Sequence, residues 1–158
     1  MSLLTFDNPV FCTYAIAAAL MIVKMMSQGW ITVFRMIKIG GGYRYEEDAR
    51  RSPANPHPSP EQLLPNEYVE RSRRMHGNDV ENIPLFLAAG LLYVCTAPSG
   101  IVSFWVFAAY VLSRLAHFYV LLTARSHESR ASLWTIGSVA IYFMAAMVLW
   151  SALWHLKG

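Results

Sequence analysis

The 158-residue chain has little charge and almost no cysteine. Asp, Glu, Lys and Arg make up 15% of it, whereas a soluble domain usually holds about a quarter. Its two cysteines, Cys12 and Cys95, both lie within apolar runs, so we expect free thiols and no disulfide framework. The sequence contains no phosphate-cradling glycine loop, nucleophile elbow or paired-cysteine metal motif, and its five histidines have no ligand-like spacing with cysteines. We therefore expect no metal site and none of those soluble enzyme classes.

Apolar residues, in contrast, make up 55% of the chain and gather in long runs. Runs of about 18 to 25 residues are long enough, as helices, to cross a hydrocarbon layer of roughly 30 Å. The first run has no basic residue ahead of it and no small-residue cleavage site after it, so we interpret it as a span and not as a signal peptide. The pattern predicts one all-α membrane domain, residues 1–158, built as a four-helix bundle. The expected spans are residues 10–34, 80–97, 101–123 and 133–154.

Basic residues are distributed unequally among the predicted loops. Eight lie between the first two spans, two lie between the third and fourth, and none lies in the turn between the second and third. Because Lys and Arg concentrate on the cytoplasmic side, we place both basic loops there and both termini on the opposite face. Four tryptophans near the span ends fit an interfacial belt: Trp105, Trp134, Trp150 and Trp154.

The first loop, about residues 35–78, is the only sizeable stretch outside the spans. Its prolines gather in residues 52–65, where we expect extended structure and no helix. After Pro65, Asn66 is a suitable N-cap, and Glu67 begins a segment of helical character. We predict one continuous helix from there into the second span.

Polar residues interrupt that second span where it begins. Arginines on this helix are suited to clamp carboxylates, while Asn78 and Glu81 are suited to hold an ammonium or amide group. The alternative is a solvated helix end whose arginines only follow the positive-inside rule. For Asn78, Asp79 and Glu81, which enter an apolar segment, we favour a functional role. Four side chains recur at helical spacing as one stripe: Arg71, Arg74, Asn78 and Glu81.

Two further pairs of polar residues lie inside predicted spans. Arg114 and His117 share one face of the third, and because Arg114 cannot lose its proton it needs a carboxylate such as Asp79 or Glu81. The alternative to a ligand site is a buried ion pair that only sets the register of the helices. Lys24 and Gln28, which are one helical turn apart, lie too deep in the first span to reach water. We expect a carboxylate partner such as Asp79 for Lys24, in a structural role.

Several segments resemble the MAPEG family, the membrane-associated proteins in eicosanoid and glutathione metabolism. The resemblance covers essentially the whole chain and is closest to the branch that holds microsomal glutathione transferases and microsomal prostaglandin E synthases. It implies a homotrimer of four-helix subunits in the endoplasmic reticulum membrane, or the mitochondrial outer membrane, with glutathione bound between subunits on the cytoplasmic side. The matching segments are VERSRRMHGNDVENIPLF (69–86), SRLAHFYVLL (113–122), ESRASLW (128–134), IVKM (22–25) and the acidic EED (46–48).

The resemblance also implies roles for individual residues. Arg130, in the predicted loop before the fourth span, takes the place of the arginine that stabilises the glutathione thiolate. Asp48 takes the place of the acidic loop residue that assists it. Either Arg35 or Lys38 stands for a basic residue at the end of the first span. The other positions that correspond to the glutathione site are Arg73, Arg74, His76, Asn78, Glu81, Arg114, His117 and Trp134.

The chain departs from the family pattern at several of these positions. Gly77, Ala131 and Trp134 stand where the prostaglandin synthase branch has arginine, serine and tyrosine. Leu121 replaces a tyrosine common to both branches, and Ala49 replaces a cysteine through which some microsomal transferases are activated. These departures favour a general conjugating enzyme, a glutathione S-transferase acting on lipophilic electrophiles in detoxification, with glutathione peroxidase activity in addition.

Two alternatives share the architecture: a glutathione-dependent prostaglandin E synthase and a non-catalytic lipid-binding scaffold. A transporter subunit has less support, because the sequence contains no discontinuous helix or inverted repeat. We expect membrane lipid as a partner and no nucleic acid.

The predicted orientation can be tested by proteolysis. If the first loop faces the cytosol, protease added to sealed microsomes cuts within residues 40–66 and leaves the termini protected. Fragment sizes measured by mass spectrometry identify the cut. Protection of the loop together with cleavage of the termini would contradict the orientation.

Overall fold

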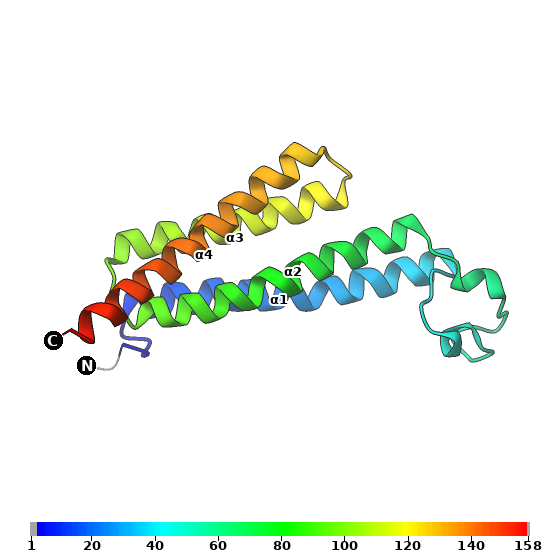
Figure 1. Cartoon of the computed structure of the whole chain (residues 1–158). Helices are drawn as coiled ribbons and strands as arrows, with labels where there is room; N and C mark the ends of the chain where they lie inside the picture. Colours follow the sequence, from blue (N-terminus) through cyan, green and yellow to red (C-terminus); the bar gives the residue numbers. More distant parts are fainter. Residues whose placement is uncertain (1–2, 158) are drawn as a thin grey trace.

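The computed structural model describes residues 3–157 as a bundle of four long helices, and these residues form no strand. The helices lie side by side, with both ends of the chain at one end of the bundle and the long loop at the other (Figure 1). This confirms the predicted all-α four-helix architecture. The elements are α1 (Pro9–Ile39), η1 (Glu46–Ala49), η2 (Pro60–Leu63), α2 (Glu67–Val94), α3 (Gly100–Leu122) and α4 (His127–His155), where η denotes a 3₁₀ helix.

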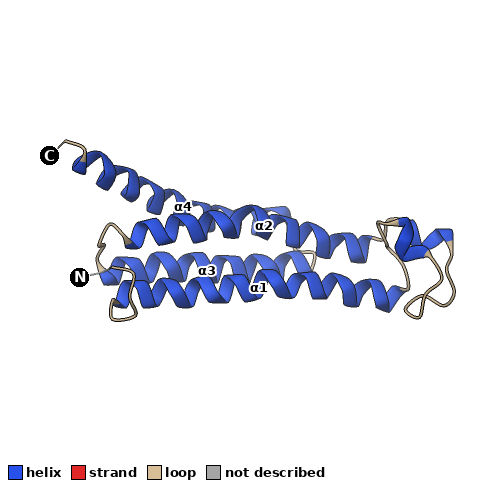
Figure 2. Ribbon diagram, turned by 90° about the horizontal axis from the view of Figure 1, so that it is seen from below, coloured by secondary structure: helices blue, strands red, loops and turns tan. Residues whose placement is uncertain are grey.

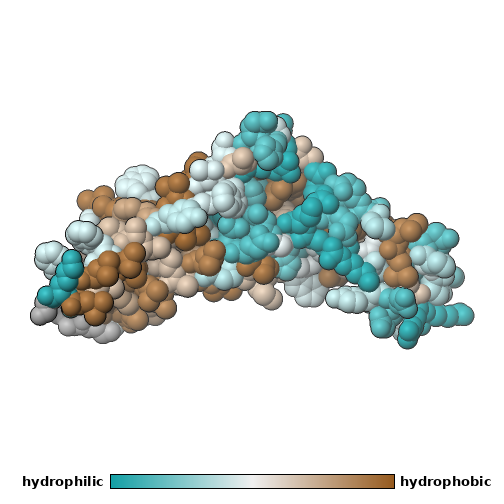
Figure 3. Space-filling model, viewed as in Figure 1, coloured by the Kyte–Doolittle hydropathy of each residue, from teal (hydrophilic) through white to brown (hydrophobic). Residues whose placement is uncertain are grey.

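Three of the helices, α1, α3 and α4, are long and apolar enough to cross a membrane. In α2, the polar residues from Asn78 to Asn82 interrupt the apolar stretch, so this helix does not reach the same apolarity. It lies in the bundle beside the others and contacts all three of them. Hydrophobic side chains gather mainly at the end that holds the termini, and hydrophilic ones at the loop end (Figure 3). The face shown in Figure 3 therefore divides along the bundle axis.

Helix α1 is longer than the predicted first span. It continues to Ile39 and ends at Gly40, whose left-handed backbone (φ 61°) lets its N–H bond back to Ile37 O. Arg35 and Lys38 consequently lie in the last turns of a helix and not in the loop. The apolar run ended before the helix did because Arg35 and Lys38 interrupt the hydropathy while the backbone hydrogen bonds of the helix continue.

Helix α4 also begins earlier than predicted. Ser126 caps it, with its hydroxyl oxygen accepting from the N–H of Ser129 (3.3 Å), and Glu128 lies in the first turn. Arg130 therefore lies within the first turns of α4, and its placement in a loop was wrong. In Figure 2, the C-terminal part of α4 diverges from the other three helices.

The prediction that prolines exclude helix from residues 52–65 was also wrong. The short helix η2 begins at Pro60, a first-turn position where the missing N–H is not needed. Ser59 and Gln62 form a capping box that closes this turn. The start of α2, in contrast, is as predicted: Asn66 Oδ1 accepts from the N–H of Tyr68 (3.0 Å), and the helix continues unbroken to Val94.

Aromatic rings form the core at the end near the termini. Phe86 and Tyr110 stack with centroids 4.0 Å apart, and Tyr14 and Phe107 pack beside them. The four exposed tryptophans named above lie on the outer surface, and both cysteines are free, as predicted. Gly90 allows Tyr14 to pack directly against the α2 backbone, because a Cβ at this position would lie 2.7 Å from Tyr14 Cε2.

We expect Gly90→Ala to destabilise the protein. The added methyl group has to displace the Tyr14 ring, which is held by the hydrogen bond from its hydroxyl to Leu87 O (2.7 Å); overpacking of this kind costs typically about 1–3 kcal/mol. Thermal unfolding in detergent measures the effect. Gly77→Ala is the matched control in the same helix, since nothing lies within 4 Å of its new Cβ. Equal midpoints for Gly90→Ala and wild type would contradict the tight packing.

Candidate functional site

A single buried carboxylate, that of Asp79 in α2, joins three helices. Lys24 Nζ and Gln28 Nε2 from α1 both donate to its Oδ2. Arg114 from α3 donates through Nε to Oδ1 (3.0 Å) and through Nη2 to the same oxygen. The carboxylate partner expected for Lys24, and one of the two expected for Arg114, is therefore Asp79.

This cluster contains more positive than negative charge. Lys24 and Arg114 are two cations with 7% and 1% of their side chains exposed, and they share one carboxylate that is 2% exposed. Arg114 Nη2 also donates to Asn78 Oδ1 (2.6 Å), which connects the cluster to the next residue of α2. The excess positive charge favours an anion nearby.

Beside the cluster, an open groove of about 270 Å³ lies between α2, α3 and α4. Its lining combines polar side chains of arginine, asparagine and histidine with apolar ones of leucine, alanine and tryptophan. It brings together five of the residues that the sequence analysis assigned to a glutathione site. The lining residues are Arg74, Asn78, His117, Leu121, His127, Arg130, Ala131 and Trp134.

Arg130 is the cation in this groove that has no acceptor. Its Nε is buried and has no hydrogen-bond partner among residues 3–157, and the guanidinium forms no ion pair with them. Arg74, in contrast, pairs with Glu67 Oε1 at the helix surface (2.5 Å). A buried donor without an acceptor costs about 1–3 kcal/mol, so Arg130 is suited to receive an anionic group.

Three other basic residues near the loop end contact other residues of the chain. Buried Arg35 donates to Tyr68 O (2.7 Å) and lies over the Tyr68 ring, 4.2 Å from its centroid. Lys38 Nζ lies 5.7 Å from the same centroid but is exposed. Arg73 donates to Glu70 and to Gly42 O (2.7 Å). None of these three basic residues lines the groove; they hold α1 and the loop to α2.

The remaining predicted residues lie apart from the groove within one chain. Asp48 and Glu81 are exposed and form no ion pair with the described residues. Asp48 belongs to η1, which contacts η2 and no other described element. His76 is half-buried on α2 and does not line the groove, whereas His117 is buried and does.

One groove residue was missed in the sequence. His127 lies one turn before Arg130 on α4, so the two share a face of the helix. Helical spacing from Arg130 would have indicated it, but the segment was predicted as a loop. Leu121 and Ala131 were noted only as departures from a family pattern, and the structure places both in the lining of the groove.

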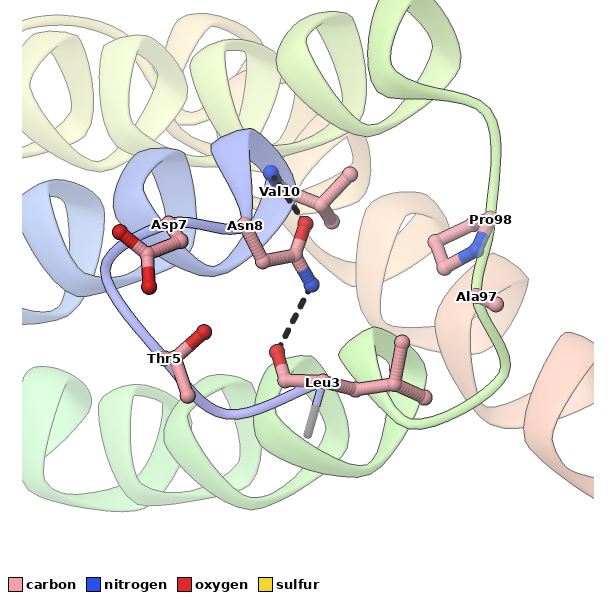
Figure 4. Close-up of a pocket in the computed structure, with 7 residues that line it drawn as sticks. All are labelled: Leu3, Thr5, Asp7, Asn8, Val10, Ala97 and Pro98. Atoms are coloured by element: carbon pink, nitrogen blue, oxygen red, sulfur yellow. Dashed lines mark hydrogen bonds between the residues drawn. The ribbon is translucent and has the colours of Figure 1, made fainter. Parts of the chain in front are cut away.

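Two larger cavities lie at the opposite end, where the termini are. One of about 450 Å³ lies between the N-terminal segment and the turn after α2 (Figure 4). Asp7 is its only charged lining residue, and Asn8 is occupied by bonds to Leu3 O (2.7 Å) and from Val10 N (3.0 Å). The other, of about 480 Å³, is lined largely by apolar side chains including Trp150 and Trp154. Neither is lined by a Lys or Arg side chain, although His155 lines the second, and no metal-binding cluster of three His, Cys, Asp or Glu side chains occurs within residues 3–157.

These features define a class: an all-helical membrane protein with a cationic groove at the end of the bundle opposite its termini. The chain belongs to the MAPEG family, whose sequence model matches residues 14–150. It is 29% identical to prostaglandin E synthase of Homo sapiens over 97% of each chain. It is 31% identical to microsomal glutathione S-transferase 1 of Homo sapiens over 94% of each chain, and 31% identical to that of Sus scrofa over 93% of this chain and 94% of the relative.

Glu70 of α2 anchors the long loop. Burial raises the pKa of its carboxyl, but hydrogen bonds from Arg44 and Arg73 and the charges of these arginines outweigh burial, so the pKa lies below its ordinary value. A lowered pKa stabilises the folded state above the unfolded pKa of about 4.3, and this stabilisation is lost as the pH falls through the folded pKa.

We expect Glu70→Gln to lower thermal stability at pH 7 by up to about 1 kcal/mol, since the pairs are partly exposed. The difference from wild type should shrink as the pH falls below about 4, because the wild-type carboxyl is then protonated too. Unfolding midpoints in detergent at both pH values check this. Glu47→Gln, an exposed carboxylate without an ion pair among the described residues, is the control. A difference independent of pH would contradict the ionic role of Glu70.

Proposed function

We propose that this protein is a membrane-bound glutathione S-transferase that conjugates glutathione to lipophilic electrophiles, with glutathione peroxidase activity in addition. The observation that carries the proposal is Arg130, a groove cation whose buried Nε has no acceptor in the described chain. Membership of the MAPEG family and similarity to proteins named microsomal glutathione S-transferase 1 support the choice of glutathione as the thiol.

The chemistry requires the thiolate of glutathione. A thiol with an ordinary pKa near 8.5 is mostly protonated at neutral pH, and only the thiolate is a good nucleophile. A guanidinium beside the sulfur stabilises the thiolate and lowers that pKa, so the proton passes to water. The sulfur then attacks the electrophilic carbon, a C–S bond forms, and a leaving group such as halide departs with its electron pair. In this scheme Arg130 acts on the reacting sulfur.

The mixed lining of the groove suits the two substrates. Glutathione is hydrophilic and carries two carboxylates, which Arg74, Asn78 and His117 are suited to bind. Leu121 and Trp134 offer apolar contact to an electrophile dissolved in lipid. A groove open at the membrane surface lets the two substrates approach from different phases.

We further propose a homotrimer in which a neighbouring subunit completes each groove. The exposed carboxylates Asp48 and Glu81 lie away from the groove of their own chain, so they contribute to a site only if that site lies between subunits. Of the two basic residues at the end of α1, Lys38 is more available than Arg35, which is buried and already bonded to Tyr68. We assign the protein to the endoplasmic reticulum membrane, with the groove in the cytosol.

A prostaglandin E synthase is the competing proposal, because the human enzyme of that name matches over the whole length at 29% identity. It would use the same thiolate on an endoperoxide. Turnover of a lipophilic aryl halide, compared with isomerisation of a prostaglandin endoperoxide by the same preparation, separates the two. Glutathione binding without turnover of either substrate would favour the non-catalytic scaffold.

We expect Arg130→Ala to lower conjugation turnover by on the order of 10²-fold while glutathione affinity changes much less, because the thiolate is one contact among several. The thiolate absorbance that appears on adding glutathione should fall or move to higher pH. Arg130→Lys should restore part of the activity, since charge is kept but the planar fork is lost.

Arg125→Ala is the matched control. Arg125 lies in the turn between α3 and α4, is exposed and does not line the groove, so its loss should leave turnover and thiolate formation unchanged. Near-normal turnover and thiolate formation in Arg130→Ala would remove Arg130 from the chemistry. His117 and Arg114 would then be the candidates to test.

A further inference from the structure

We propose that Asp79 is a positioning residue for the groove. It holds the Arg114 guanidinium, and Arg114 in turn fixes the side-chain amide of Asn78. The NH2 group of Asn78 then faces bound glutathione. The inference rests on the proposed function, because glutathione is the ligand it invokes. It adds a residue that does not line the groove, and it specifies which group of the ligand Asn78 contacts.

The orientation of the Asn78 amide follows from the chemistry of its partner. Arg114 Nη2 lies 2.6 Å from the side-chain oxygen of Asn78. A guanidinium only donates hydrogen bonds, so the amide atom that it meets has to be the oxygen, and the nitrogen lies on the other side. Asn78 Nδ2 has no acceptor among residues 3–157, although Asn78 lines the groove. Its NH2 group is therefore free to donate to a ligand.

Arg114 holds this orientation only because Asp79 holds Arg114. The Arg114 side chain is 1% exposed and donates to Asp79 Oδ1 through both Nε and Nη2, so two points of attachment fix the guanidinium plane. Lys24 and Gln28 fix Asp79 in turn from α1. Without the carboxylate, Arg114 loses both attachments and Asn78 loses the constraint on its amide.

The arrangement selects the chemistry of the ligand group. The oxygen of the Asn78 side chain faces the Arg114 guanidinium, so the group left for a ligand is the NH2 donor, which is suited to a carboxylate or peptide carbonyl oxygen. The positive charge of Arg114 beside that oxygen disfavours an ammonium group there. Of the two partners expected from the sequence for Asn78, an ammonium or an amide group, the geometry therefore favours the carbonyl of an amide. The excess positive charge of the cluster favours the same choice.

Asn78→Asp is the sharpest single test. The new carboxylate still accepts from Arg114 and balances the excess charge, so we expect the fold to persist. Where the NH2 group stood, however, an oxygen now faces the ligand oxygen, and a hydrogen bond to a charged group is replaced by repulsion. We expect the Kd for glutathione to rise by about 10- to 100-fold, with kcat at saturating glutathione little changed. Thr32→Val, which removes the α1–α2 contact between Thr32 and Ser72 (3.0 Å) outside the cluster, is the control.

A double-mutant cycle tests whether Asp79 acts through Asn78. Glutathione Kd is measured by equilibrium dialysis in detergent for wild type, Asp79→Asn, Asn78→Ala and the double variant, with thermal midpoints alongside. If Asp79 acts through Asn78, the double variant binds glutathione as Asn78→Ala does; if Asp79 only supports the fold, the two losses add. Should Asp79→Asn fail to fold, Asn78→Asp still decides whether the amide faces the ligand.

The outcomes separate this proposal from the one on which it rests. Wild-type protein that does not bind glutathione overturns the proposed function and this inference with it. Wild-type protein that binds glutathione while Asn78→Asp binds it equally well overturns only this inference, as does additivity in the cycle. Weakened binding in Asn78→Asp, together with coupling between Asp79 and Asn78, supports it.

Discussion

The arrangement of the bundle depends on the carboxylate of Asp79. It is nearly inaccessible to water and accepts hydrogen bonds from Lys24 and Gln28 on α1 and from Arg114 on α3. Removing one partner of a buried ion pair is costly because an unpaired charge remains. The same carboxylate therefore fixes how α1, α2 and α3 sit together, and it fixes the guanidinium that lies next to the groove.

The groove exists because the helices end at different levels. Helices α1 and α2 extend past the turn between α3 and α4, so the start of α4 lies against the side of α2 and not at its end (Figure 1). Arg130, in the first turns of α4, is thereby brought beside Arg74 and Asn78 of α2. The loop beyond is tied back to α2 through Glu70 with Arg44 and Arg73, and none of its residues lines the groove.

The sequence predicted the features that follow from burying charge in an apolar setting. Lys24 and Arg114 had to find a carboxylate, and Asp79 was one of the few available inside the spans. Helix ends were harder, because hydropathy marks where the apolar run stops and not where the backbone hydrogen bonds stop. The cap at Ser126 lies in a polar stretch, so the first turns of α4 were missed and His127 with them. Glu81 shares the helical stripe with Asn78, but its neighbours leave it exposed, which periodicity alone does not reveal.

Several arginines of the bundle have partners inside the chain, whereas Arg130 has a buried Nε without one. Arg35, Arg73 and Arg114 donate to backbone or carboxylate oxygens, and each thereby fastens one helix or loop to another. The buried Nε of Arg130 has no hydrogen-bond partner within residues 3–157, so this side chain joins no two elements of the chain. Folding alone gains nothing from a desolvated donor without an acceptor. A ligand anion that supplies the acceptor offsets the desolvation free energy of Arg130 on binding. This favourable contribution grows as negative charge builds up on the ligand. Such a gain favours the ionised form of a bound thiol over its neutral form, which is the discrimination that the proposed transferase needs.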